Sequence, residues 1–257
     1  MIISKEDISI RETKIRVIKK GSGSPLIYLH GYNYDFDWHS VLDELSNQYT
    51  VYRLDYPGFN FSESNESIDS VQDLAFFILD FIDKLELNDI TLMGSSLGGW
   101  LAMEISAISP EKIAKLILID SFGIRVEGIK LQNIFRMNQN TIISKLFTSE
   151  MLQVRTLDQY SNNKELEQVI LQNNISTAHL AWNPYFHNPK LLNLMHRLRM
   201  PIIVIWGSND QILPLAYGEK LQELLPHSIL KTVDGASHLP HIEKPNEFLN
   251  IINNFFG

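Results

Sequence analysis

The hydrophobic positions of the chain fall into short runs that alternate with longer amphipathic stretches. The short runs are rich in β-branched residues and lie at residues 13–19, 25–30, 50–54, 90–93, 116–119, 202–206 and 229–233. Most are nearly continuous in apolar character, which is typical of strands buried on both faces of a parallel sheet. The stretches at residues 71–85, 96–107, 214–225 and 247–256 repeat apolar side chains with a helical period. Strands alternating with helices predict an α/β fold.

One connection between predicted strands is much longer than a simple crossover requires. A parallel crossover needs only about a dozen residues, whereas residues 122–200 separate two predicted strands. Helical patterning recurs inside this segment, for example at residues 129–147 and 164–171. Long connections with structure of their own are often lids. We therefore predict a helical cap at residues 122–200, inserted into a core of residues 1–121 and 201–257. Two ordinary helices joined by a loop are the alternative.

Composition and charge exclude several classes of function. The chain has 257 residues, a length that suits one large domain or two small ones, and 44% of the residues are hydrophobic. Acidic residues outnumber basic ones by 30 to 22, and the net charge is −8. This balance argues against binding to nucleic acid and to anionic membranes, both of which favour a basic surface. The absence of cysteine excludes disulfides, thiolate metal sites and a cysteine nucleophile.

The distribution of apolar residues also bears on location. The first residues lack a basic segment followed by an apolar stretch, so a secretory signal is not expected. The apolar runs are far too short to span a bilayer. We therefore expect a cytoplasmic protein that does not bind a membrane; its oligomeric state is left open.

The strongest chemical signal is the segment Gly94-Ser95-Ser96-Leu97-Gly98-Gly99. It follows a predicted strand and opens a predicted helix, the context of a nucleophile elbow. Such a turn is so tight that the positions flanking the nucleophile must be small, which Gly94 and Gly98 satisfy. Ser96 is therefore the predicted nucleophile. Ser95 does not fit, because Met93 would then occupy the first glycine position.

A serine nucleophile needs a base, and the base needs an anion. His238 lies just past the last predicted strand, and Asp210 lies just past the preceding one. The chain order serine, aspartate, histidine is that of α/β-hydrolases. Asp120 also ends a predicted strand and is the rival acid, although a local hydrogen-bonding role is expected for it. His30 and His241 are expected to be structural.

Chemistry at a carbonyl also requires donors for the oxyanion. The backbone N–H of Leu97 follows the nucleophile at a helix N-terminus and is the first predicted donor. The second should come from the loop after residues 25–30, where we assign the N–H of Tyr32, with Asn33 as the alternative. No metal or cofactor is expected for this chemistry.

These motifs together resemble the α/β-hydrolase superfamily, in the cap-bearing branch of esterases, haloperoxidase-like enzymes and carbon–carbon bond hydrolases. The resemblance spans almost the whole chain and rests on residues 30–31, 55–62, 94–99, 206–210 and 235–245. It implies a mostly parallel eight-stranded sheet flanked by helices, a Ser-Asp-His triad and an inserted cap. One departure is Asn60, where the family usually has a second glycine. Asparagine tolerates a left-handed backbone, so we expect that turn to persist.

Aromatic residues and a methionine of the core and cap are candidates to line an apolar substrate pocket. These candidates are Trp38, Trp100, Phe122, Met137, Trp182 and Tyr185. Plain packing between cap and core is the alternative for each.

The function predicted from these features is a serine hydrolase that cleaves a small ester or related acyl substrate. A carbon–carbon bond hydrolase or an aminopeptidase of the same fold is an alternative. A small-molecule receptor or signalling protein that keeps the triad is an alternative from another class. The expected partner is a small-molecule substrate, not a nucleic acid or a membrane.

Overall fold

A single twisted sheet of eight strands forms the centre of the protein. The structure is a computed structural model that describes residues 2–35 and 37–256. The strands are β1 (Ser4–Ile10), β2 (Thr13–Lys20), β3 (Pro25–Leu29), β4 (Thr50–Leu54), β5 (Ile90–Ser95), β6 (Ile113–Ile119), β7 (Ile202–Gly207) and β8 (Ser228–Val233). They lie in the order β1-β2-β4-β3-β5-β6-β7-β8. Only the pairs β1–β2 and β2–β4 are antiparallel, so the predicted mostly parallel sheet is confirmed.

The first strand did not appear among the apolar runs of the sequence. β1 carries the charged residues Lys5, Glu6 and Asp7 and lies at the edge of the sheet. Six of its seven residues are exposed or only half-buried. An edge strand of this kind has no continuous hydrophobic signal, because most of its side chains face water.

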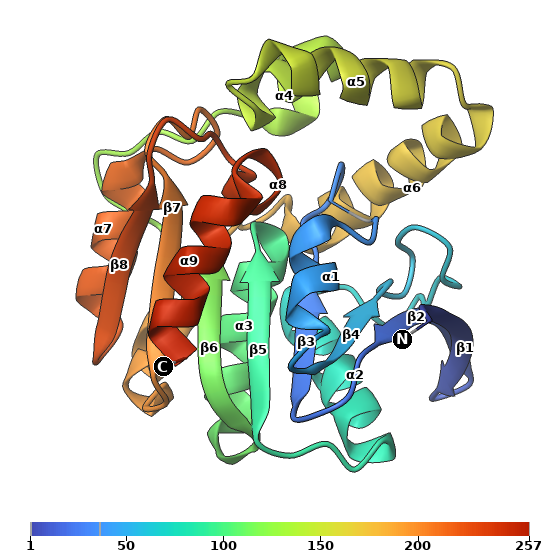
Figure 1. Ribbon diagram of the computed structural model, residues 1–257, viewed down its shortest axis with the longest axis vertical. Coiled ribbons are helices and arrows are strands. Elements are labelled where there is room, and N and C mark those ends of the chain that lie inside the picture. Colours follow the sequence, from blue (N-terminus) through green and yellow to red (C-terminus); the bar gives the residue numbers. More distant parts are fainter. Residues whose placement is uncertain (1, 36, 257) are drawn as a thin grey trace.

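Helices cover both faces of the sheet (Figure 1). One face carries α1 (Ser40–Leu45) and α9 (Pro245–Phe256), and the other carries α2 (Val71–Lys84), α3 (Leu97–Ile108) and α7 (Leu215–Leu224). Two short elements, η1 (Pro110–Lys112) and α8 (Pro240–Glu243), lie in connections. Side chains of β3 alternate between the two cores: Leu26 and Tyr28 pack with α1 and α9, and Ile27 and Leu29 pack with α2 and α3. Burial on both faces explains the continuous apolar runs.

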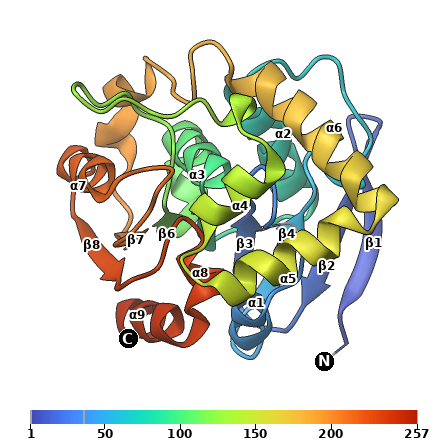
Figure 2. The same cartoon turned by 90° about the horizontal axis from the view of Figure 1, so that it is seen from above.

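The segment between β6 and β7 forms a separate group of helices. It contains η2 (Ile134–Arg136), α4 (Gln139–Leu146), α5 (Glu150–Ser161), α6 (Lys164–Ala181) and η3 (Leu191–Arg197). Figures 1 and 2 show α4 and α5 crossing above the ends of the parallel strands. The helix predicted at residues 129–147 is wrong over its first part, where only the single turn η2 forms before α4. The helix predicted at residues 164–171 continues to Ala181.

Hydrogen bonds tie α6 to loops of the core. Asn173, fully buried in α6, accepts a hydrogen bond from the backbone N–H of Asn60 at 2.8 Å and donates one to its side-chain oxygen at 2.9 Å. The Ser176 hydroxyl donates to the carbonyl of Gly58 at 2.6 Å. Asn60 has φ +51°, so the left-handed turn expected from the sequence is present. The residue that departs from the family pattern is therefore also one of those that anchor α6.

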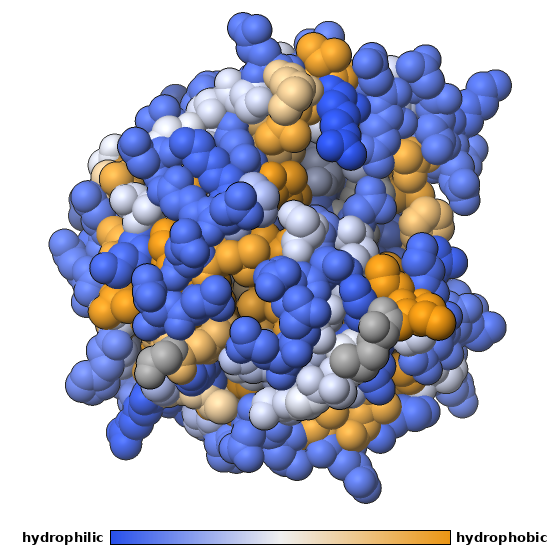
Figure 3. All heavy atoms as spheres, in the orientation of Figure 1, coloured by the Kyte–Doolittle hydropathy of each residue, from blue (hydrophilic) through white to orange (hydrophobic). Residues whose placement is uncertain are grey.

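Hydrophilic side chains cover most of the face drawn in Figure 3, with apolar residues scattered among them. Among the described residues, none of the helices combines the length and the apolar character that crossing a bilayer would require.

Candidate active site

The turn between β5 and α3 holds Ser96 in a backbone conformation that few residues adopt. Its φ is +55° and its ψ is −116°. A Cβ atom added to Gly94 would lie 2.2 Å from the carbonyl oxygen of Gly98, and one added to Gly98 would lie 2.1 Å from that of Leu29. Both glycines are therefore required by close backbone contacts, as the elbow motif predicts. Strained φ and ψ values of this kind persist where the surrounding structure enforces them.

Gly98→Ala should destabilise the protein strongly, because the methyl group would collide with the backbone of β3 rather than with a movable side chain. We expect a loss of about 3 kcal/mol in the free energy of unfolding, measured by urea denaturation. Gly128→Ala is the matched control, since nothing lies within 4 Å of the added atom. Because Gly128 has a left-handed φ of +82°, alanine at this position should lower the free energy of unfolding by only about 1 kcal/mol. Equal losses in the two variants would contradict this account of the elbow.

Ser96, His238 and Asp210 form one hydrogen-bonded chain, hereafter the Ser96 cluster. The Oγ of Ser96 lies 2.9 Å from Nε2 of His238, and Nδ1 of His238 lies 2.7 Å from Oδ2 of Asp210. The other carboxylate oxygen of Asp210 accepts the backbone N–H groups of Ile212 at 2.7 Å and Leu213 at 2.9 Å. Two anchored oxygens fix the carboxylate, which in turn fixes the orientation of the imidazole. The structure thus brings together the three residues singled out from the sequence.

Asp120 lies beside this cluster but does not contact the imidazole by a hydrogen bond. Its Oδ1 accepts the backbone N–H of Gly207 at 3.0 Å, which is the local role expected for it. Burial and then the negative charge of Asp210 raise the pKa of the Asp120 carboxyl well above its usual value. A protonated Asp120 can donate a hydrogen bond to Asp210, and this gives a role to its Oδ2, a buried oxygen that is otherwise without a partner among the described residues.

The two predicted oxyanion donors come from two different segments, the start of α3 and the loop after β3. Leu97 is the first residue of α3, where backbone N–H groups have no intrahelical acceptor. Tyr32 lies in the loop after β3, and the preceding Gly31 is so near the nucleophile that an added Cβ would lie 3.4 Å from the Cβ of Ser96. The N–H of Tyr32 donates to no other residue in the described part of the chain. Both N–H groups are therefore available to a ligand at the serine.

His30 supports the loop that carries Tyr32. Its ring stacks on Tyr56 with 4.1 Å between the centroids, and its Nε2 lies 3.3 Å from the side-chain nitrogen of Asn60. Burial and then the positive charge of Arg53 lower the pKa of His30 from 6.5 to about 4. A neutral imidazole enclosed in this way has the structural role predicted from the sequence.

Three of the predicted pocket residues are buried or half-buried in the larger core. Phe122 is buried, and its ring centroid lies 6.1 Å from that of His238. Trp100 is buried in α3 and donates its indole N–H to Glu104 at 3.0 Å. Met137 is half-buried against the larger core. Of these three, Phe122 has a position next to the reacting groups.

The other three predicted pocket residues lie in other surroundings. Trp38 packs with the core of α1 and α9 and donates to Asp43 at 3.1 Å. Trp182 is 54% exposed and lies against Phe135. The hydroxyl group of Tyr185 donates to the carbonyl of Gln132 at 2.7 Å and accepts the N–H of Ile134, the first residue of η2, at 2.9 Å. None of them has a hydrogen bond or ring contact with the Ser96 cluster within residues 2–35 and 37–256.

Comparison with known proteins shows the family of the chain. Residues 24–245 match the family model described as the alpha/beta hydrolase fold. The chain is 26% identical to the dihydrolipoyllysine-residue acetyltransferase component of the acetoin cleaving system of Cupriavidus necator, over 95% of this chain and 67% of the relative. It is 25% identical to the pimeloyl-acyl-carrier-protein methyl ester esterase of Vibrio parahaemolyticus, over 91% of this chain and 95% of the relative.

Solved structures of low sequence identity share the fold. The 2-hydroxy-6-oxo-6-phenylhexa-2,4-dienoate hydrolase of Rhodococcus sp. strain RHA1 superposes with a TM-score of 0.81 at 18% identity, over 99% of each chain. Since the matched family model covers most of the chain, from the loop before β3 to the start of α9, the chain belongs to the alpha/beta hydrolase fold family and is a hydrolase.

Proposed function

We propose that the protein is a serine hydrolase that cleaves a small ester or a related acyl compound. The observation that carries this proposal is the unbroken chain from Ser96 Oγ through His238 to Asp210, with separations of 2.9 and 2.7 Å. A hydroxyl group within hydrogen-bond distance of a neutral imidazole can lose its proton as it attacks a carbonyl carbon.

The proposed reaction has two halves. In the first, Nε2 of His238 takes the proton of Ser96, Oγ forms a bond to the carbonyl carbon, and the N–H groups of Leu97 and Tyr32 bind the oxyanion. The imidazolium then returns the proton to the departing alkoxide, which leaves an acyl group on Ser96. In the second half, His238 removes a proton from water as the water oxygen attacks the acyl carbon. The imidazolium then returns this proton to Oγ of Ser96 as the bond between Oγ and the acyl carbon breaks, which releases the acid and restores the serine. Asp210 stabilises the positive charge on His238 in both halves.

The segment of residues 122–200 is proposed to act as a cap over this site. Ser96 and His238 are each only 2% exposed, so a substrate reaches them only when part of the covering structure moves. The segment is hydrogen-bonded to the core at two places: α6 is held through Asn173 and Ser176, and the connection between α4 and α5 is held through Thr148 and Ser149, whose N–H groups donate to Glu243. Opening is therefore expected to break one of these two sets of hydrogen bonds. A covered site excludes water from the reacting groups until substrate has entered.

An ester is proposed as the substrate class because the Vibrio relative, which matches along most of both chains, is named as a methyl ester esterase. The likeness to the Rhodococcus dienoate hydrolase supports the fold alone, since the two sequences are 18% identical. We further propose a cytoplasmic location, with a small molecule as the partner.

Hydrolysis of p-nitrophenyl esters from acetate to palmitate tests the proposal. We expect saturable turnover of short acyl chains and a steep decline for long ones, because the serine is enclosed. The result that contradicts an esterase is the absence of turnover at every length in protein shown to be folded by circular dichroism. That result would favour a carbon–carbon bond hydrolase, which meta-cleavage dienoates would detect, or a receptor, which would be stabilised by a ligand without turning it over.

A further inference from the structure

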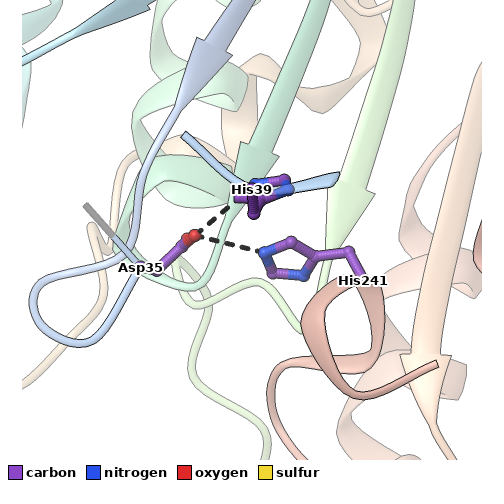
Figure 4. Close-up of side chains that lie close together, drawn as sticks. All are labelled: Asp35, His39 and His241. Carbon is purple, nitrogen blue, oxygen red and sulfur yellow. Dashed lines mark hydrogen bonds and ion pairs between the residues drawn. The ribbon is translucent and has the colours of Figure 1, made fainter. Parts of the chain in front are cut away.

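A second cluster of titratable side chains lies apart from the Ser96 cluster. Asp35 follows β3 in the same loop as Tyr32, His39 precedes α1, and His241 lies in α8. Figure 4 shows the three side chains pointing toward one another. Oδ1 of Asp35 lies 3.2 Å from Nε2 of His241 and 3.8 Å from Nε2 of His39. The side chains of Asp35 and His241 are fully buried, and that of His39 is 11% exposed.

Hydrogen bonds account for only part of this arrangement. Nε2 of His241 lies within hydrogen-bond distance of Oδ1 of Asp35, at 3.2 Å, and of the Tyr28 hydroxyl group, at 3.0 Å. Both ring nitrogens of His39 are buried and have no hydrogen-bond partner among the described residues, and the same holds for Nδ1 of His241. A buried polar atom without a partner costs roughly 1–3 kcal/mol. Such groups are rare in folded proteins and indicate an additional ligand or a functional role.

The separations suit a shared metal ion. Two ligands at the corners of a tetrahedron, each about 2.0–2.1 Å from a zinc ion, are about 3.3 Å apart. All three ligand atoms of this cluster lie within 4.8 Å of one another. The second oxygen of Asp35 is already held, because it accepts the N–H of Gly31 at 3.1 Å and the hydroxyl group of Tyr28. Carboxylate ligands of metal sites are typically oriented by such outer hydrogen bonds.

We propose that Asp35, His39 and His241 bind a divalent transition-metal ion such as Zn²⁺. This ion would stabilise the positions of active-site segments without contacting the reacting groups. A cavity of about 370 Å³, lined by Asp35, His39 and Asp37 among others, gives an ion a path from solvent. Two imidazoles and one carboxylate are ligands that suit first-row transition metals rather than Ca²⁺ or Mg²⁺.

The location gives the ion a positioning role. Asp35 is joined to Gly31, next to the predicted oxyanion donor Tyr32, whereas His241 lies three residues after His238. One ion would therefore link the loop that carries the oxyanion donor to the segment that carries the base. No metal is expected for the reaction itself, and the proposed ion shares no ligand with the Ser96 cluster.

The test uses the full chain, stripped of metal with a chelator and titrated with Zn²⁺ by isothermal calorimetry at pH 7.5. We expect one ion per chain and, at a hundredfold excess over Kd, a rise in melting temperature of roughly 5–10 °C. His39→Gln should weaken binding by at least about tenfold and, at the same Zn²⁺ concentration, reduce this rise to about half or less. His196→Gln, which alters an exposed histidine of η3, is the matched control and should bind as the wild type does.

The histidine variant also separates this site from the other group of possible ligands. Asp120, Asp210 and His238 lie within 4.8 Å of one another as well, and Zn²⁺ bound there would inhibit turnover. Uptake that is unchanged in His39→Gln would overturn the proposal, as would the absence of stoichiometric uptake by the wild type. If His39→Gln does not fold, X-ray absorption of the zinc-loaded wild type decides: scattering from two imidazoles supports the site, and scattering from one or none refutes it.

Discussion

Ser96→Ala should reduce kcat for the best ester substrate by about 10⁶-fold, the loss typical of removing a serine nucleophile from a hydrogen-bonded triad. The expectation rests on the 2.9 Å contact between Ser96 Oγ and His238 Nε2 and on the elbow that holds the hydroxyl group at the edge of the sheet. The alanine variant should fold normally, because it loses one oxygen atom and keeps the turn. Steady-state assays and covalent labelling with an organophosphorus ester measure the effect.

Ser95→Ala is the matched control for this result. Ser95 is the preceding residue in the chain, it is fully buried, and its hydroxyl group has no hydrogen-bond partner among the described residues. Removing that hydroxyl group should leave kcat within a few-fold of the wild type and labelling intact. A Ser96→Ala protein that kept more than a few per cent of the activity would show that another group is the nucleophile.

Much of the core could be predicted from the sequence because its signals are local. The strand at residues 50–54 is a short apolar run and the helix from Val71 has a strong helical period, and their predicted bounds differ from the observed ones by at most one residue. The elbow was identified for the same reason, since its glycines and serine occupy six consecutive residues. The grouping of Ser96, Asp210 and His238 followed from their common place after parallel strands, whose carboxyl ends meet at one edge of the sheet.

Features that depend on tertiary contacts could not be predicted in this way. The many asparagines of residues 122–200 look like compositional bias in the sequence, yet Asn173 is fully buried and pairs with Asn60, which is distant in the chain. Trp38 was expected near the substrate, but its side chain packs on the opposite core because residue 38 lies just before α1. The Asp35, His39 and His241 cluster joins two distant segments and was missed, although the four-residue spacing of Asp35 and His39 was a weak signal.

The second large effect on kcat is expected at Asp210, one of the two aspartates that lie near His238. Asp210→Asn should lower kcat by about 10⁴-fold, because an amide cannot stabilise the imidazolium and disfavours the productive tautomer of His238. Asp120→Asn should retain activity within about tenfold. Burial and then the charge of Asp210 raise the pKa of Asp120 well above its usual value, which favours the protonated carboxyl. An amide in the same place still donates to Asp210 and still accepts the N–H of Gly207, so it preserves both contacts.

Kinetics of the two variants at pH 8 measure this difference, with Asp234→Asn as the control for an exposed aspartate at a strand end. The opposite order, in which Asp120→Asn is the more damaged enzyme, would assign the charge to Asp120 and make Asp210 its neutral partner. The observed contacts argue against that order. Asp210 lies 2.7 Å from the imidazole and has its other oxygen held by two backbone N–H groups, which stabilise a negative charge at that residue. Asp120 has only the single backbone donor of Gly207, so the buried proton belongs on Asp120 and the charge on Asp210.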